Sequence, residues 1–124
     1  MARMTKDIEE VFKVADRMDA VAFSELLTAD VTFRFANSDL WKGREAVVDG
    51  LNYLFSKISG LKHDLKGIYV KGNGYAVEAV ANYRMKDGNL ISLPVVSVLK
   101  YRGNLIEDYR IYIDISPVMN YGVK

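Results

Sequence analysis

The hydrophobic residues in the first half of the chain recur at the spacing of amphipathic helices. The apolar stripe of the first expected helix consists of Ile8, Val11, Phe12, Ala15 and Met18. Asp19 can cap a second short helix, because an aspartate side chain accepts a hydrogen bond from a free backbone N–H of the first turn. Gly43 leads into a third helix, for which Gly60 is the expected C-terminal stop. The pattern therefore predicts three helices.

Apolar and polar residues alternate in the segments that are expected to form strands. The stretch "DVTFRF" at 30–35 alternates in this way, and 37–43 is expected to be a loop. After Gly60, turn signals at 71–74, 86–89 and 101–104 separate segments of about a dozen residues, which is typical of an antiparallel meander. Gly67 and Pro94 lie inside two of these segments, where they predict a bulge or kink.

This order of elements predicts an α+β fold, in which N-terminal helices pack on a strongly curved, mostly antiparallel sheet. The length of 124 residues suits one domain, and no linker or internal repeat divides it, so we expect a single domain over 1–124.

Composition and charge exclude several functional classes. Seventeen basic minus sixteen acidic residues give a net charge of +1, without the basic stripe of a nucleic-acid-binding protein. The chain has no cysteine, which excludes disulfides and thiolate ligands. No apolar run approaches the roughly 20 residues that cross a bilayer, and the N-terminus lacks the apolar segment of a signal peptide. We expect a cytoplasmic protein without nucleic-acid or membrane partners.

The succession of motifs resembles a known superfamily. A helix, a short helix, the strand "ADVTFRFANS", the helix "GREAVV" and long strands ending in "GNLIEDYRIYIDISP" are similar to the nuclear transport factor 2-like superfamily, and most of all to its SnoaL-like branch. The resemblance implies a cone-shaped sheet around an apolar cavity and a homodimer formed through the sheet. It also implies acid/base chemistry of isomerase, cyclase or dehydratase type on a small hydrophobic carbonyl compound, without cofactor or metal. The alternative is a non-catalytic module for binding a ligand or a partner.

Asp114 is the first candidate for catalysis. Its spacing matches a strand-end aspartate that resembles the acid/base of SnoaL-like polyketide cyclases. At the wall of an apolar cavity, desolvation would raise the pKa of this carboxyl and suit it to remove a proton next to a carbonyl. The alternative is an exposed acid that ends the strand or pairs with Arg110.

His63 is the only histidine and the second catalytic candidate. Strand alternation puts it in phase with the apolar Leu61 and Leu65, so its side chain is expected to face inward. Histidine is the usual acid/base near neutral pH, although a packed core histidine is the alternative. One histidine without clustered partners does not make a metal site.

Tyr112 shares the strand phase of Asp114. If Asp114 faces the cavity, Tyr112 does too and can donate a hydrogen bond to a developing enolate oxygen. If Asp114 faces outward, the inward residues are Tyr109, Ile111 and Ile113, and both arrangements are compatible with the sequence.

Several further side chains are expected to contact a substrate, with ordinary core packing as their alternative. The predicted substrate-binding residues are Phe33, Phe35, Trp41, Tyr53, Asn82 and Tyr112. By resemblance, Trp41 lies near the cavity mouth, where an aromatic can act as a lid. Val80 and Asn82 occupy the positions where limonene epoxide hydrolases carry a charged pair. Phe35 lies near the position where ketosteroid isomerases carry their catalytic aspartate. The chain therefore departs from both of these enzyme types.

Overall fold

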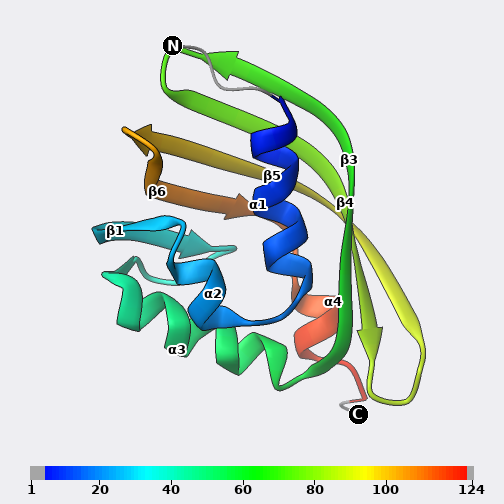
Figure 1. The fold of residues 1–124 in the computed structure, drawn as a ribbon. Helices are drawn as coiled ribbons and strands as arrows, with labels where there is room; N and C mark the ends of the chain where they lie inside the picture. Colours follow the sequence, from blue (N-terminus) through cyan, green and yellow to red (C-terminus); the bar gives the residue numbers. More distant parts are fainter. Residues whose placement is uncertain (1–4, 123–124) are drawn as a thin grey trace.

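The computed structural model describes residues 5–122, which form helices and one sheet (Figure 1). The helices are α1 (Thr5–Asp16), α2 (Ala20–Ser24), α3 (Arg44–Phe55) and α4 (Ser116–Met119). The strands are β1 (Leu27–Phe35), β2 (Trp41–Lys42), β3 (Ile58–Lys71), β4 (Gly74–Met85), β5 (Leu90–Arg102) and β6 (Leu105–Tyr112). The α+β prediction is confirmed.

The sheet is mixed, with the strand order β2-β1-β6-β5-β4-β3. Strands β3 to β6 form the predicted antiparallel meander, whereas β1 pairs in parallel with β6 and in antiparallel fashion with β2. The long strands β3 and β4 bend and curl the sheet around α1, and α2 and α3 lie below β1 (Figure 1). The sheet does not close into a barrel, because β2 and β3 remain its edges.

Alternation along the strands separates the two faces of the sheet. In β4, Ala79, Ala81, Tyr83 and Met85 are buried, while the residues between them are less buried or exposed. The inward side chains pack against α1, α2 and α3, which supply Phe12, Phe23 and Leu51, among others, to the core. The concave face therefore holds the hydrophobic core, and the convex face is available to solvent.

The predicted irregularities in the strands have different outcomes. The register of β3 and β4 shifts between Leu65 and Gly67, which confirms a bulge at Gly67. Of the bulge or kink expected at Pro94, the bulge is wrong, because Pro94 pairs with Val80 in unbroken register, while the kink stays a prediction. Pairing of β5 with β6 starts only at Val96, so Pro94 lies beyond the end of β6, where its missing N–H breaks no ladder on that side.

The boundaries of two predicted segments also change. Helix α3 ends at Phe55 instead of near Gly60, because Ile58 is already the first residue of β3 and is buried in the core. The expected loop at 37–43 contains the short strand β2. Asp19 caps α2 as predicted, since its Oδ1 accepts a hydrogen bond from the Ala22 amide at 3.0 Å. Helix α4 has Pro117 in its first turn, where proline suits a helix start, and it was not predicted.

Candidate functional site

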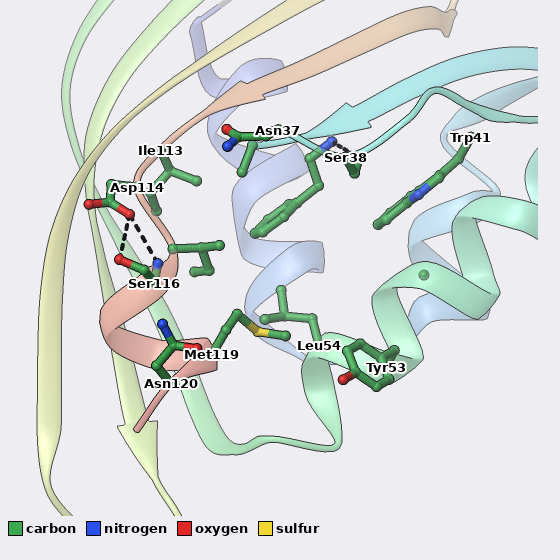
Figure 2. Close-up of a pocket in the computed structure, with 14 residues that line it drawn as sticks. Asn37, Ser38, Trp41, Tyr53, Leu54, Ile113, Asp114, Ser116, Met119 and Asn120 are labelled. Atoms are coloured by element: carbon green, nitrogen blue, oxygen red, sulfur yellow. Dashed lines mark hydrogen bonds between the residues drawn. The ribbon is translucent and has the colours of Figure 1, made fainter. Parts of the chain in front are cut away.

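A pocket of about 600 Å³ opens to solvent at one end of the cone. We call it the mouth pocket; it lies between the end of β1, helix α3 and the segment from the end of β6 into α4 (Figure 2). Its apolar wall is formed by Phe35, Trp41, Leu54, Ile113, Ile115 and Met119. Its polar lining consists of Asn37, Ser38, Tyr53, Asp114, Ser116 and Asn120. This volume is in the range of ordinary small-molecule sites.

Trp41 forms a fixed wall of the mouth pocket. Its ring stacks on Phe33 with a centroid distance of 5.4 Å and an interplanar angle of 3°. On helix α3, a Cβ atom added to Gly50 would lie only 2.5 Å from the indole, so the glycine is what lets the ring approach the helix. The packing on Phe33 and Gly50 therefore holds Trp41 in place, which does not suit the expected lid.

A second, much smaller cavity of about 40 Å³ lies in the core, and we call it the inner cavity. The lining residues that carry polar side-chain groups are His63, Tyr83, Ser97 and Tyr109, and the others are apolar. Two residues, Phe35 and Leu54, line both this cavity and the mouth pocket. The two spaces are therefore neighbours, and these two side chains form the partition between them.

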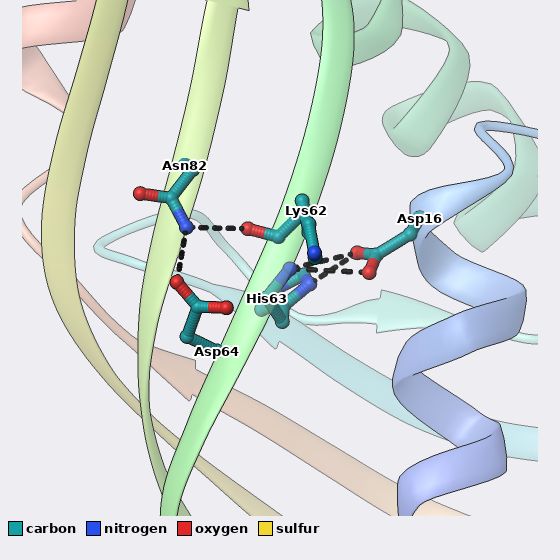
Figure 3. Close-up of polar contacts among 5 residues, drawn as sticks. All are labelled: Asp16, Lys62, His63, Asp64 and Asn82. Atoms are coloured by element: carbon teal, nitrogen blue, oxygen red, sulfur yellow. Dashed lines mark hydrogen bonds and ion pairs between the residues drawn. The ribbon is translucent and has the colours of Figure 1, made fainter.

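His63 faces inward, as predicted. Its ring contacts a carboxylate that was not among the predicted site residues. The Nδ1 atom of His63 lies 2.6 Å from Oδ1 of Asp16, the last residue of α1 (Figure 3). The backbone amide of His63 also donates to the two carboxylate oxygens, at 3.2 and 3.1 Å. With Nδ1–H donating to Asp16, Nε2 carries the lone pair. This is the arrangement of a carboxylate-oriented histidine base.

The His63–Asp16 pair is largely shielded from water. The side chain of His63 is 12% exposed and that of Asp16 is 22% exposed. The ring of Phe12 packs edge-on against the imidazole, with a centroid distance of 5.2 Å. Helix α1 and strand β3 thus bring the two groups together on the concave side of the sheet.

Two tyrosine hydroxyls share the interior with His63. Burial raises the pKa of Tyr83 and the pKa of Tyr109 above the ordinary tyrosine value. For Tyr109, a hydrogen bond with the Ser97 side chain acts in the opposite direction, and the charge of Asp16 adds to the rise in pKa. Both phenols therefore stay protonated and are potential hydrogen-bond donors.

Asp114 is in a different environment from the one that the sequence reading expected. Strand β6 ends at Tyr112, and the Asp114 carboxylate is exposed at the rim of the mouth pocket. Its Oδ1 accepts hydrogen bonds from the Ser116 hydroxyl at 2.7 Å and from the Ser116 amide at 3.1 Å (Figure 2). These bonds lower the pKa of Asp114, so the expected rise in pKa is wrong. Solvation and the turn into α4 are the physical reasons.

Two of the predicted substrate-binding residues lie away from both cavities. Tyr112 is 56% exposed and contributes to a depression on the convex face of the sheet. Asn82 alternates with buried Ala81 and Tyr83, and its amide donates to the Lys62 carbonyl and to the Asp64 carboxylate (Figure 3). The prediction that Tyr112 and Asn82 line the cavity is wrong. On β4 and β6, neighbouring residues in the sequence point toward the core instead. The buried residues on β6 are Ile106 and Tyr109.

The remaining predicted substrate-binding residues do line a cavity. Phe35, Trp41 and Tyr53 contribute to the mouth pocket, while Phe33 is fully buried behind Trp41 and lines the inner cavity. The structure thus places Asp114 and His63 at two different spaces on either side of the Phe35–Leu54 partition.

Asp16 had only a weak signal in the sequence. An acidic residue at the C-terminus of a helix interacts unfavourably with the helix dipole, so its presence there points to a partner elsewhere. Its partner lies 47 positions away in the chain, and no local pattern connects them.

Within residues 5–122, no group of three or more histidine, cysteine, aspartate or glutamate side chains is arranged to hold a metal ion. In the same part of the chain, none of the helices has the length and apolar character needed to cross a membrane.

Comparisons with known proteins agree with this fold. The family model described as "SnoaL-like domain" matches residues 8–109. Among curated proteins, the comparison found no significant match.

Solved structures of similar shape cover most of the chain. A hypothetical protein from Catenulispora acidiphila DSM 44928 with a ketosteroid isomerase-like fold, in complex with trimethylamine, has a TM-score of 0.83 and 20% identity, over 94% of this chain and 91% of that chain. A putative SnoaL-like polyketide cyclase from Jannaschia sp. CCS1 has a TM-score of 0.76 and 18% identity, over 97% and 95%. An LEH-like epoxide hydrolase from M. tuberculosis has a TM-score of 0.74 and 14% identity, over 93% and 85%. At such identities the likeness shows the fold alone.

Proposed function

This chain belongs to the SnoaL-like domain family, and we propose that it binds a small hydrophobic carbonyl compound in the mouth pocket. The observation that carries the proposal is the open pocket of about 600 Å³, which has an apolar wall and polar groups at its rim. Binding sites for small molecules usually combine a mostly apolar lining with a few placed polar groups that fix orientation.

The charges of the pocket favour a neutral ligand over an anion. Neither lysine nor arginine lines it, and Asp114, whose pKa is lowered, places a negative charge at the rim. Asn37 and Asn120 carry side-chain amides that can donate to a carbonyl oxygen, while Phe35 and Met119 can contact the apolar body of the ligand. A neutral ketone fits this distribution better than a carboxylate or phosphate does.

Trp41 provides a direct test, since it is the only tryptophan and lines the pocket. We expect 1-indanone to change the intrinsic fluorescence of Trp41 in a saturable way, and benzoate to have a much weaker effect. Met119→Lys places a charge in the pocket and should abolish the response. Val21→Lys is the matched control, because Val21 is an exposed residue of α2 that does not line the pocket.

Two results would contradict the proposal. One is the absence of a saturable response to 1-indanone in the unmodified protein. The other is an equal response in Met119→Lys and Val21→Lys, which would place the ligand elsewhere.

We also propose that the chain forms a homodimer through the convex face of the sheet. A shallow depression there is lined by Val80, Pro94, Val96 and Tyr112, together with Lys66 and Glu78. Its apolar members include Val96, which is 37% exposed, and Tyr112. In a two-fold contact, Lys66 of each copy can pair with Glu78 of the other, which gives the patch a self-complementary charge pattern.

The oligomeric state tests this second proposal. Light scattering of the unmodified protein should give twice the mass of the chain, and Tyr112→Lys should reduce it to the mass of a monomer. Val21→Lys on the helical side should remain a dimer. A monomeric unmodified protein at micromolar concentration would refute the proposal and leave ligand binding in the mouth pocket unaffected.

A further inference from the structure

We propose that the indole N–H of Trp41 is the hydrogen-bond donor that recognises the carbonyl oxygen of the ligand, and that Gly50 keeps the indole in position for this contact. The inference rests on the binding function proposed above and deepens it. It assigns the residue by which the mouth pocket distinguishes a carbonyl compound from a hydrocarbon of the same shape.

The side chains of β1 fix the plane of the indole. The ring of Trp41 is nearly parallel to those of Phe33 and Phe35, with interplanar angles of 3° and 5° and centroid distances of 5.4 and 6.5 Å. Trp41 on β2 is also the cross-strand partner of Phe33. Aromatic rings that stack across two paired strands hold each other in one orientation, so one face of the indole is engaged with β1.

Helix α3 approaches the indole closely at Gly50. A Cβ atom added to Gly50 would lie 2.5 Å from Cη2, 2.5 Å from Cζ3 and 2.6 Å from Cζ2 of Trp41. Nearly equal distances to three adjacent ring atoms place this Cβ over the ring and not beyond its edge. Any larger residue would therefore displace the indole. Because β1 and α3 both pack on the plane of the ring, its edge, which carries Nε1–H, is the part left to meet a ligand.

The indole N–H is a donor without an acceptor in the part of the chain that the structure describes. Within residues 5–122, Nε1 of Trp41 forms no hydrogen bond, and the only buried side-chain nitrogen or oxygen atom without a partner is Oγ1 of Thr28. Nε1 is therefore accessible, and it belongs to a half-buried residue that lines the mouth pocket. An indole N–H can only donate, so it is suited to bind an acceptor oxygen of a ligand.

The position of Trp41 favours it over the side-chain amides of the pocket. Trp41 and Asp114 lie on opposite sides of the mouth pocket, and Asn37 and Asn120 lie on the side of Asp114 (Figure 2). The carboxylate of Asp114 repels the partial negative charge of a carbonyl oxygen. Both asparagines are also exposed to water, whereas the indole is fixed among apolar side chains, where a hydrogen bond is stronger and costs less ordering. The carbonyl group is thus directed to Trp41, with the apolar body of the ligand toward Met119.

The hydrogen bond can be observed directly in the unmodified protein. Trp41 is the only tryptophan, so its indole gives a single ¹H–¹⁵N resonance. Titration with 1-indanone should move the proton resonance downfield in a saturable way and slow its exchange with water, because the proton becomes bound to the carbonyl oxygen. Indane has the same two rings without an acceptor, and it should bind without the downfield shift.

Trp41→Phe tests the donor by removing the N–H while keeping an aromatic ring. Affinities are measured by ¹⁹F NMR of 5-fluoro-1-indanone and 5-fluoroindane, which requires no tryptophan. The ratio of the ketone affinity to the hydrocarbon affinity should fall about 5- to 10-fold in Trp41→Phe, as expected for the loss of one hydrogen bond. A change in packing alone would weaken both ligands and leave the ratio unchanged.

Gly50→Ala tests how the donor is held. The added methyl group displaces the indole, so the resonance of the free protein should move and the affinity ratio should fall. Gly60→Ala is the matched control, because a Cβ atom at Gly60 meets nothing closer than the Cβ atom of Arg84 at 3.4 Å. Gly60→Ala should change neither the indole resonance nor the ratio.

The possible failures are distinguishable. Binding of 1-indanone without a downfield shift, or an unchanged affinity ratio in Trp41→Phe, would overturn the role of Trp41 and leave the binding function intact. An unchanged resonance and ratio in Gly50→Ala would overturn the role of Gly50 alone. If neither fluorinated ligand binds the unmodified protein saturably, the binding function itself is refuted, and the assignment of Trp41 with it.

Discussion

Two aspartates lie near the candidate site, and they differ in almost every physical respect. Asp114 is exposed at the rim of the mouth pocket, and Ser116 donates two hydrogen bonds to it. Asp16, the last residue of α1, is mostly shielded and binds the ring and the backbone amide of His63. The first carboxylate accepts the hydrogen bonds of a turn, and the second holds the ring of a histidine.

The comparison shows that solvation and partners decide what a carboxylate can do. The hydrogen bonds to Asp114 lower its pKa, so it is ionised near neutral pH and is a weaker proton acceptor than an ordinary carboxylate. Asp16, in contrast, is bound by the backbone amide and the ring of His63 and is largely shielded from water. The carboxylate at the predicted strand end is therefore less suited to accept a proton than an ordinary carboxylate, and the sequence did not predict Asp16 as the partner of His63.

The largest expected change in the free energy of unfolding concerns the aromatic residues between the mouth pocket, where Asp114 lies, and the interior, where Asp16 and His63 lie. Phe33 is fully buried and stacks on Trp41 on the mouth side and on Tyr109 on the inner side. Phe33→Ala should lower the free energy of unfolding by about 3–5 kcal/mol, because it removes a large core side chain and leaves a cavity. Urea denaturation measures this change.

Tyr53→Ala is the control for Phe33→Ala. Tyr53 lines the mouth pocket but is mostly exposed, so its removal should change the free energy of unfolding by less than about 0.5 kcal/mol. Equal losses in the two variants would mean that the mouth is as tightly packed as the interior, and the comparison of the two regions would fail.

The second prediction compares the stability that each of the two carboxylates contributes. Asp16→Ala leaves the backbone amide and Nδ1 of His63 without their acceptor, which should cost about 1–3 kcal/mol of stability. Asp114→Ala should cost clearly less, because water can replace the lost acceptor at an exposed site. A larger loss in Asp114→Ala, measured in the same urea titration, would contradict the expectation that the shielded carboxylate of Asp16 stabilises the fold more than the exposed one.

Much of the fold could be predicted because its signals are local. Alternation of apolar residues located the long strands, and Gly67 correctly marked a bulge. Pro94 does not mark a bulge, since its effect on pairing depends on where the neighbouring strand β6 ends, which is a property of the whole sheet. The C-terminal end of α3 depended in the same way on the burial of Ile58 in the core.

The site was only partly predictable, for a related reason. Alternation correctly turned His63 inward, because Leu61 and Leu65 on the same strand fix the phase. On β6, both phases were compatible with the sequence, and the packing of Tyr109 against the helices decides between them. The pairing of His63 with Asp16 joins two elements that are distant in sequence. It could not be predicted because it depends on how the sheet curls around α1.

The smallest expected effect is the pH dependence of stability that Asp114 contributes. Its folded pKa lies below the ordinary value, which is about 3.9 for an unperturbed aspartate. A lowered folded pKa means that the contribution is present above the unfolded pKa and is lost as the pH falls through the folded pKa. The melting temperatures of the unmodified protein and Asp114→Asn should therefore differ slightly near neutral pH and converge below about pH 3–4. Glu25→Gln, a change in another exposed acid, provides the baseline for general charge effects. If Asp114→Asn instead melted above the unmodified protein near neutral pH, and this difference disappeared on acidification, the folded pKa of Asp114 would be raised, as in a desolvated acid, and its assignment to the turn would fail.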